Sequence, residues 1–93
     1  HVSVAAALLF AGASMASAAC YADYKAKQDD PLRLHYGVIE LSSGACNSKS
    51  SAKSEISRKI KRDGWTVLSV MGIFDESGLQ KRRNSAGAFY LKY

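Results

Sequence analysis

The two cysteines of this 93-residue chain constrain its fold more than any other feature. Cys20 has one potential partner, Cys46, and three roles are open to it: a lipid attachment point, a redox thiol, or half of a structural disulfide. A chain of this length forms one domain at most, near the lower size limit for a self-sufficient hydrophobic core. The role of Cys20 therefore decides whether a covalent link supplements that core.

An uncharged, Ala-rich stretch precedes Cys20. Residues 1–18 read HVSVAAALLFAGASMASA, a short apolar centre followed by small residues, and Ala16-Ser17-Ala18 matches the A-x-A cleavage pattern. We therefore expect residues 1–18 to be a secretory signal peptide and residues 19–93 to form a single small α+β domain. A retained N-terminal membrane helix is the alternative, because roughly eighteen residues can just span a bilayer.

Export favours the disulfide among the three roles of Cys20, because cysteines in small exported domains usually pair. A Cys20–Cys46 bridge closes a loop of about 26 residues, which the chain-entropy model values at roughly 3–4 kcal/mol. Ser17 stands where a lipidation motif normally has Leu, and the cysteine spacing is not C-x-x-C, which weakens the other two roles. The sequence thus predicts a periplasmic, disulfide-stapled domain.

The positive charge lies entirely after Cys20. All 13 Lys and Arg residues and all 8 acidic residues follow it, so this part carries the net charge of +5. Lys81, Arg82 and Arg83 form a basic cluster that suits an anionic surface, either lipid head groups or an acidic protein; a solvated loop is the alternative. Export and the lack of interleaved aromatic residues argue against a nucleic-acid partner.

The first half of the domain predicts a strand and leaves one segment open. Residues 21–28 fit a strand or a short helix, and Asp29-Asp30-Pro31 breaks the chain after them. Residues 32–41 alternate with period two, which predicts a strand with an inward apolar face of Leu32, Leu34, Tyr36 and Val38. Arg33, His35 and Gly37 then face outward.

The second half predicts a helix and two strands. Ala52, Ile56 and Ile60 form an apolar stripe on a helix over residues 51–64, capped by Ser50 or Ser51 and ended by Gly64. Residues 65–74 form a strand with apolar groups on both faces, so both faces need cover: the helix on one, and on the other the N-terminal segment, a second chain or a partner. Residues 88–93 predict a terminal strand with Phe89, Leu91 and Tyr93 on one face.

These elements predict a small antiparallel or mixed sheet of about three to four strands with one helix packed on a face. The stretches DYKAK, GWTVLSV and FYLKY resemble a family of small bacterial domains of unknown function, with a Tyr-x-Lys strand, a Gly-Trp-x-x-Leu-x-Val strand and a final Tyr-rich strand. The whole chain is similar to small uncharacterised exported proteins of alphaproteobacteria. Neither resemblance implies a known reaction.

Candidate catalytic and metal-binding residues are sparse. His35 is the one histidine after the leader, no serine lies in a G-x-S-x-G motif, and His35 is expected on the surface or in a cross-strand pair. Asp29 and Asp30, even with Asp23 and Glu40, lack the D-x-D-x-D-G spacing of a calcium loop. We therefore expect no enzyme activity, no metal and no cofactor.

The aromatic residues supply the candidate partner contacts. Tyrosine is enriched at interfaces because it combines apolar area with a hydroxyl, although tyrosines in a small sheet are equally compatible with half-buried core positions. The sequence favours a non-enzymatic accessory subunit of a larger membrane or envelope complex. A freestanding periplasmic domain, monomeric or homodimeric, that binds a small ligand is the alternative. The candidate contact residues are Tyr21, Tyr24, Tyr36, Trp65, Tyr90 and Tyr93.

Overall fold

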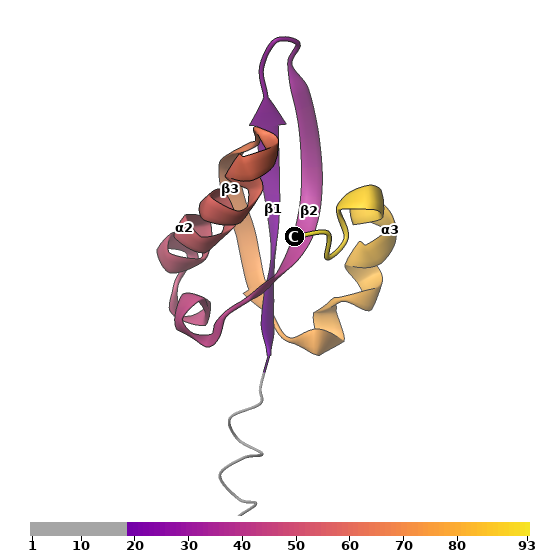
Figure 1. Ribbon diagram of the computed structural model, residues 1–93. Coiled ribbons are helices and arrows are strands. Elements are labelled where there is room, and N and C mark those ends of the chain that lie inside the picture. Colours follow the sequence, from indigo (N-terminus) through magenta and orange to yellow (C-terminus); the bar gives the residue numbers. More distant parts are fainter. Residues whose placement is uncertain (1–18) are drawn as a thin grey trace, which may run out of the picture.

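Three antiparallel strands form the sheet, with β1 in its centre. A computed structural model describes residues 19–93, and the predicted signal peptide at residues 1–18 lies outside the described residues. The strands are β1 (Cys20–Gln28), β2 (Arg33–Leu41) and β3 (Thr66–Phe74), in the order β2-β1-β3. Helix α2 (Lys49–Ile60) and the short α3 (Arg83–Ala86) lie on opposite sides of the sheet (Figure 1). The predicted small, disulfide-stapled α+β fold is confirmed.

Strand β1 resolves the segment that the sequence left open. Its central position puts both of its edges in hydrogen bonds, from Cys20 opposite Leu41 to Gln28 opposite Arg33 on the β2 side. Ala22, Tyr24 and Ala26 have no exposed surface and face α2. A strand with small side chains on its buried face lets the helix pack closely against the sheet.

The alternation predicted for β2 holds only in part, because both faces are covered in the middle of the strand. Val38 is 1% exposed, as predicted for the inward face, but Leu32 and Leu34 of that face are each 65% exposed, whereas His35 and Ile39 on the other face are 8% and 0% exposed. The reason lies in the pairing with β1, where Gly37 lies opposite Tyr24 and leaves room for its ring. A Cβ at Gly37 would lie 2.6 Å from Tyr24 Oη, so a larger residue fits there only if the Tyr24 ring moves. This contact sets the phase of the strand, and a shift by one residue exchanges its two faces.

Helix α2 packs its predicted apolar stripe against the sheet. Ala52, Ile56 and Ile60 are each 0% exposed, which confirms the stripe. The predicted cap was wrong, because the helix begins earlier and Ser48 Oγ accepts the Ser51 amide at 3.0 Å. A 3₁₀ turn over Lys61–Asp63 extends the helix, and Gly64 ends it with φ of 83°, as predicted.

Strand β3 departs from the simple two-faced pattern. Its pairing with β1 shifts between Asp23 and Tyr24 and again between Lys25 and Ala26. Such irregularities insert extra residues into one strand and change which side its side chains take. Val67 is 6% exposed beneath α2, while Leu68 is 47% and Met71 is 45% exposed. The sequence predicted that both faces of this strand need cover. Residues 19–93 do not supply that cover in full.

The C-terminal segment is helical rather than a fourth strand, so the predicted terminal strand was wrong. After β3, short 3₁₀ turns and α3 cross the sheet face opposite α2 and reach the outer edge of β2 (Figure 1). A 3₁₀ turn at Gly87–Phe89 precedes one parallel bridge between Tyr90 and Val38, and the Leu91 amide donates to the Val38 carbonyl at 2.8 Å. Leu91 then has φ of 53°, which turns the chain away before a ladder can form.

Candidate interaction surfaces

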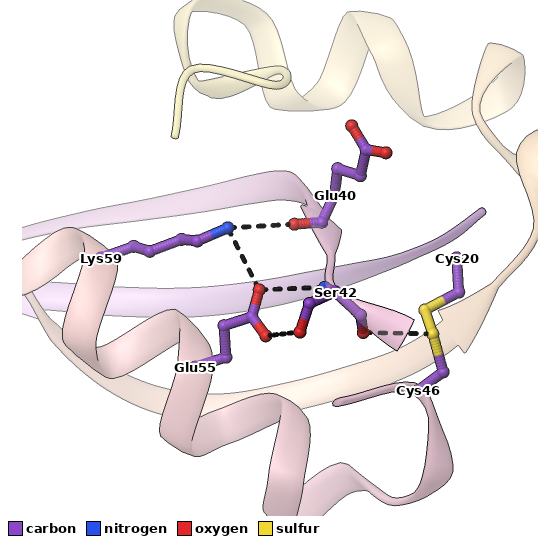
Figure 2. Close-up of a disulfide and its surroundings, with 6 residues drawn as sticks. All are labelled: Cys20, Glu40, Ser42, Cys46, Glu55 and Lys59. Atoms are coloured by element: carbon purple, nitrogen blue, oxygen red, sulfur yellow. Dashed lines mark hydrogen bonds and ion pairs between the residues drawn. A yellow bond between two sulfur atoms is a disulfide. The ribbon is translucent and has the colours of Figure 1, made fainter. Parts of the chain in front are cut away.

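The disulfide fastens the start of the central strand to the turn before α2. Cys20 and Cys46 are bonded, with their Cα atoms 6.1 Å apart, and Cys46 lies in a 3₁₀ turn over Ser43–Asn47 (Figure 2). This confirms the predicted pair. A disulfide in a domain of this size is typical of an oxidising, exported environment.

Beside the disulfide, a buried carboxylate ties α2 to the end of β2 (Figure 2). Glu55 is 5% exposed, and its two oxygens accept the Ser42 amide at 3.0 Å and the Ser42 hydroxyl at 2.5 Å. Lys59 Nζ lies 3.1 Å from the same carboxylate. Burial favours the neutral acid, but the bonds from Ser42 and Lys59 outweigh it and lower the pKa of Glu55. The sequence offered no sign of this role, because Glu55 and Lys59 read as an ordinary pair on the helix surface.

A second polar cluster holds the C-terminal segment on the opposite face of the sheet. Asp23 Oδ2 accepts the Tyr36 hydroxyl at 2.8 Å and Arg82 Nε at 3.0 Å. The Arg82 guanidinium carbon also lies 3.9 Å from the centroid of the Phe74 ring, and its Nη1 donates to the Gly78 carbonyl at 2.7 Å. Arg82 is thus committed to intramolecular contacts, whereas its predicted companions Lys81 and Arg83 are exposed.

An aromatic cluster around His35 holds the tail, the C-terminal segment that follows α3, against β2. The ring of His35 is parallel to that of Phe89, with centroids 3.7 Å apart, and meets Trp65 edge-on at 4.3 Å. Its Nε2 lies 2.9 Å from Tyr24 Oη. Burial, with a smaller effect from Lys92, lowers the pKa of His35 to about 4, so the ring is neutral at neutral pH. His35 lies opposite Ala26 in a cross-strand pair, as one of the two expectations had it, but it is buried rather than on the surface.

The structure distributes the six predicted contact residues over both faces instead of one patch. Tyr24 is 0% and Trp65 is 9% exposed, so both belong to the core. Tyr21 stacks on Phe74 with centroids 6.3 Å apart, and Tyr36 bonds to Asp23. The remaining two are half-buried: Tyr93 donates to Asp63 Oδ2 at 2.7 Å, and Tyr90 lies at the β2 edge.

A further candidate surface surrounds β3, and the aromatic pattern did not single it out. Within residues 19–93, β3 pairs on one side only, and Thr66–Phe74 contains no charged residue. On the face opposite α2, Leu68 shares a hollow of about 290 Å³ with Leu34, Tyr36 and Lys25. On the α2 face, a groove of about 380 Å³ runs beside β3; its lining residues are Lys53, Ser57, Lys61, Trp65, Thr66 and Val67.

Residues 19–93 contain no group of three or more His, Cys, Asp or Glu residues placed to hold a metal ion. Among the same residues, no helix has the length and apolar character needed to cross a membrane. Comparison with family models, curated proteins and solved structures found no match to this chain.

Proposed function

We propose that this protein is a non-enzymatic periplasmic accessory protein that associates with a larger membrane or envelope complex. In this proposal residues 1–18 are the export signal, and the disulfide keeps the small domain folded outside the cytoplasm. The observation that carries the proposal is the uncovered apolar surface of β3. Leu68 and Met71 remain about half exposed there, at 47% and 45%.

The chemistry of β3 supports an interaction role. Edge strands of monomeric proteins usually carry charged residues or proline, which discourage pairing with another chain. Thr66–Phe74 has neither, and on one face Leu68 shares a hollow with the exposed side chain of Leu34. Covering this surface with a partner removes apolar area from water without any change in the fold.

A freestanding periplasmic domain that binds a small ligand is the second candidate. One observation favours it: a hollow of about 470 Å³ between the tail and the start of β2 is lined by charged groups of both signs. Asp63, Arg33 and Lys92 are among them, beside the rings of Trp65, Phe89 and Tyr93. Convergent polar and aromatic groups of this kind suit a small polar molecule.

Site-specific photocrosslinking in native cells separates the two candidates. A photoreactive amino acid replaces Leu68 at the β3 surface or, as a matched control, Ser54 on the exposed outer face of α2. The accessory role predicts a crosslink from position 68 to one or a few envelope proteins at fixed stoichiometry, and none from position 54. A monodisperse soluble monomer with no crosslink from position 68 would contradict it, and a crosslink to a second copy would favour the homodimer.

A further inference from the structure

The outer edge of β3 offers a full strand of backbone for pairing. Within residues 19–93, β1 pairs with one side of β3 and nothing pairs with the other. The strand is nine residues long, Thr66–Phe74. An extended peptide can add to such an edge, with affinity from main-chain hydrogen bonds and specificity from its alternating side chains. The surroundings of the edge therefore decide which peptide fits.

On the α2 face, the surroundings are basic. Lys53, Ser57 and Lys61 follow one side of α2, the side that lies next to β3, and line the groove beside Thr66 and Val67. The other side of α2 carries Glu55 and Lys59, whose charges neutralise each other near β2. Lys53 and Lys61 are exposed, and no ion pair involves either of them in the described chain. We call this part of the surface the basic groove.

On the opposite face, the surroundings are mostly apolar, with one cation, Lys25. Leu68 points away from α2 into the hollow that it shares with Leu34, Tyr36 and Lys25. Successive side chains of an added strand point alternately to the two faces of a sheet. One set would therefore lie against the basic groove and the other set beside Leu68.

A second copy of this chain fits the edge poorly. Antiparallel pairing of two β3 strands about a two-fold axis would place the two α2 helices side by side on the same face. Lys53 and Lys61 of both copies would then meet across the axis, and like charges in that position repel. The net charge of +5 adds to the repulsion. The charge distribution favours an acidic partner.

We propose, on the basis of the accessory function above, that β3 binds an extended acidic segment of the partner protein by strand addition. The segment alternates acidic residues, which face Lys53 and Lys61, with apolar residues, which pack beside Leu68. Backbone pairing holds the segment, and its carboxylates select the orientation and face. The partner is thus recognised by a short exposed stretch of alternating acidic and apolar residues.

Binding of a defined peptide to the full disulfide-bonded chain tests this proposal. The probe is a fluorescent eight-residue peptide of alternating Glu and Val, followed by fluorescence anisotropy, with a Lys and Val peptide as its charge-reversed control. We expect saturable binding of the acidic peptide that weakens with added salt, and no binding of the basic one. Equal binding of both peptides would overturn the assignment of acidic chemistry.

Two matched protein variants locate the site. Lys53→Glu/Lys61→Glu reverses the basic groove, while Arg58→Glu/Lys81→Glu makes the same change of net charge at exposed residues that do not line the groove. We expect about a tenfold or greater loss of affinity in the first variant and less than about a twofold change in the second. Equal losses would reduce the effect to net charge and overturn the site. Circular dichroism of both variants checks that α2 is intact.

Backbone methylation of the peptide tests strand addition itself. Alternate amides of an added strand point toward β3, and the others point to solvent. Methylating one alternate set should abolish binding, and methylating the other should leave it within about threefold. Indifference to both sets would overturn strand addition, as would self-association of the full chain that excludes the peptide. A partner crosslinked from position 68, together with failure of the acidic peptide, would reject this inference and leave the accessory role standing.

Discussion

The two outer edges of the sheet differ in how they are covered. The edge of β2 is closed by the chain's own C-terminal segment, through the Tyr90–Val38 bridge and the stacking of Phe89 on His35. The edge of β3 receives no strand from residues 19–93. Residues 19–93 therefore cover part of the β2 edge and leave the β3 edge without a pairing strand.

The β3 edge nevertheless has features that limit non-specific pairing with other strands. Its two register shifts twist the strand locally, and such irregularities discourage indiscriminate pairing between sheets. The charges of Lys53 and Lys61 beside it repel further copies. An apolar edge strand with positive charges beside it favours a partner of complementary charge over self-association.

The largest expected effect concerns both edges together. Cys20→Ser/Cys46→Ser removes the link across a sequence separation of 26 residues, and the chain-entropy model predicts a loss of roughly 3.5 kcal/mol in the free energy of unfolding. Because β1 lies between the two edges, amide protection should fall alike in β2 and β3. Urea unfolding with hydrogen exchange checks this, and the reduced wild-type chain is the control. Loss of protection at one edge alone would contradict the shared role.

The second-largest expected effect comes from a substitution that disrupts the β2 edge selectively. Phe89→Ala removes the ring that stacks on His35 and meets Trp65, and we expect a loss of about 2–3 kcal/mol, below the full core value because Phe89 is half-buried. Hydrogen exchange at the Leu91 amide, which bonds to Val38, should rise before that of β3. Phe89→Leu is the control and should cost less. Unchanged exchange at Leu91 would show that the bridge holds the tail without the aromatic cluster.

The features that the sequence predicted depend on local periodicity. The stripe of Ala52, Ile56 and Ile60, the helix end at Gly64 and the strand predicted at residues 65–74, found at Thr66–Phe74, follow from side-chain spacing and glycine geometry. The pairing of Cys20 with Cys46 followed because the chain has no third cysteine. Such features need no knowledge of which strand lies next to which.

The features that the sequence missed depend on tertiary neighbours. The phase of β2 is decided by Tyr24 lying over Gly37, a contact made across two strands. The C-terminal segment forms a 3₁₀ turn at Gly87–Phe89, where Phe89 stacks on buried His35, and Leu91 with φ of 53° ends the pairing with β2 after one bridge. The basic groove combines residues of α2 and β3 that no spacing rule connects. Six aromatic residues suggested the interface, yet two of them lie in the core.

Lowering the pH should destabilise the packing at the β2 edge first. The pKa of His35 is lowered to about 4 by burial and by Lys92, so between about pH 4 and the ordinary value of 6.5 the unfolded chain binds more protons than the folded one. Stability is therefore complete above pH 6.5 and falls as the pH drops toward 4, by on the order of 2 kcal/mol. Urea unfolding at a series of pH values measures the slope.

A ring that cannot titrate supplies the control for this slope. His35→Phe keeps the stacking surface against Phe89 but carries no ionisable group. Its stability should be flatter between pH 6.5 and 4.5, even if the lost bond to Tyr24 lowers it at every pH. Because the pKa of Glu55 is lowered, its contribution is lost only on further acidification. An equal slope in both proteins would remove His35 as the cause.

The smallest expected effect on the free energy of unfolding comes from a substitution at the β3 edge. Leu68→Lys replaces a side chain that is 47% exposed, so we expect the free energy of unfolding to change by less than about 0.5 kcal/mol. This contrasts with Phe89→Ala, because the apolar area at Leu68 is not removed from water by the chain's own fold. The same change places a charge where the proposed partner segment would put its apolar residues, so the affinity for the alternating Glu and Val peptide should fall although the monomer keeps its stability. A destabilisation as large as that of Phe89→Ala would mean that Leu68 serves the fold itself, and the contrast between the two edges would fail.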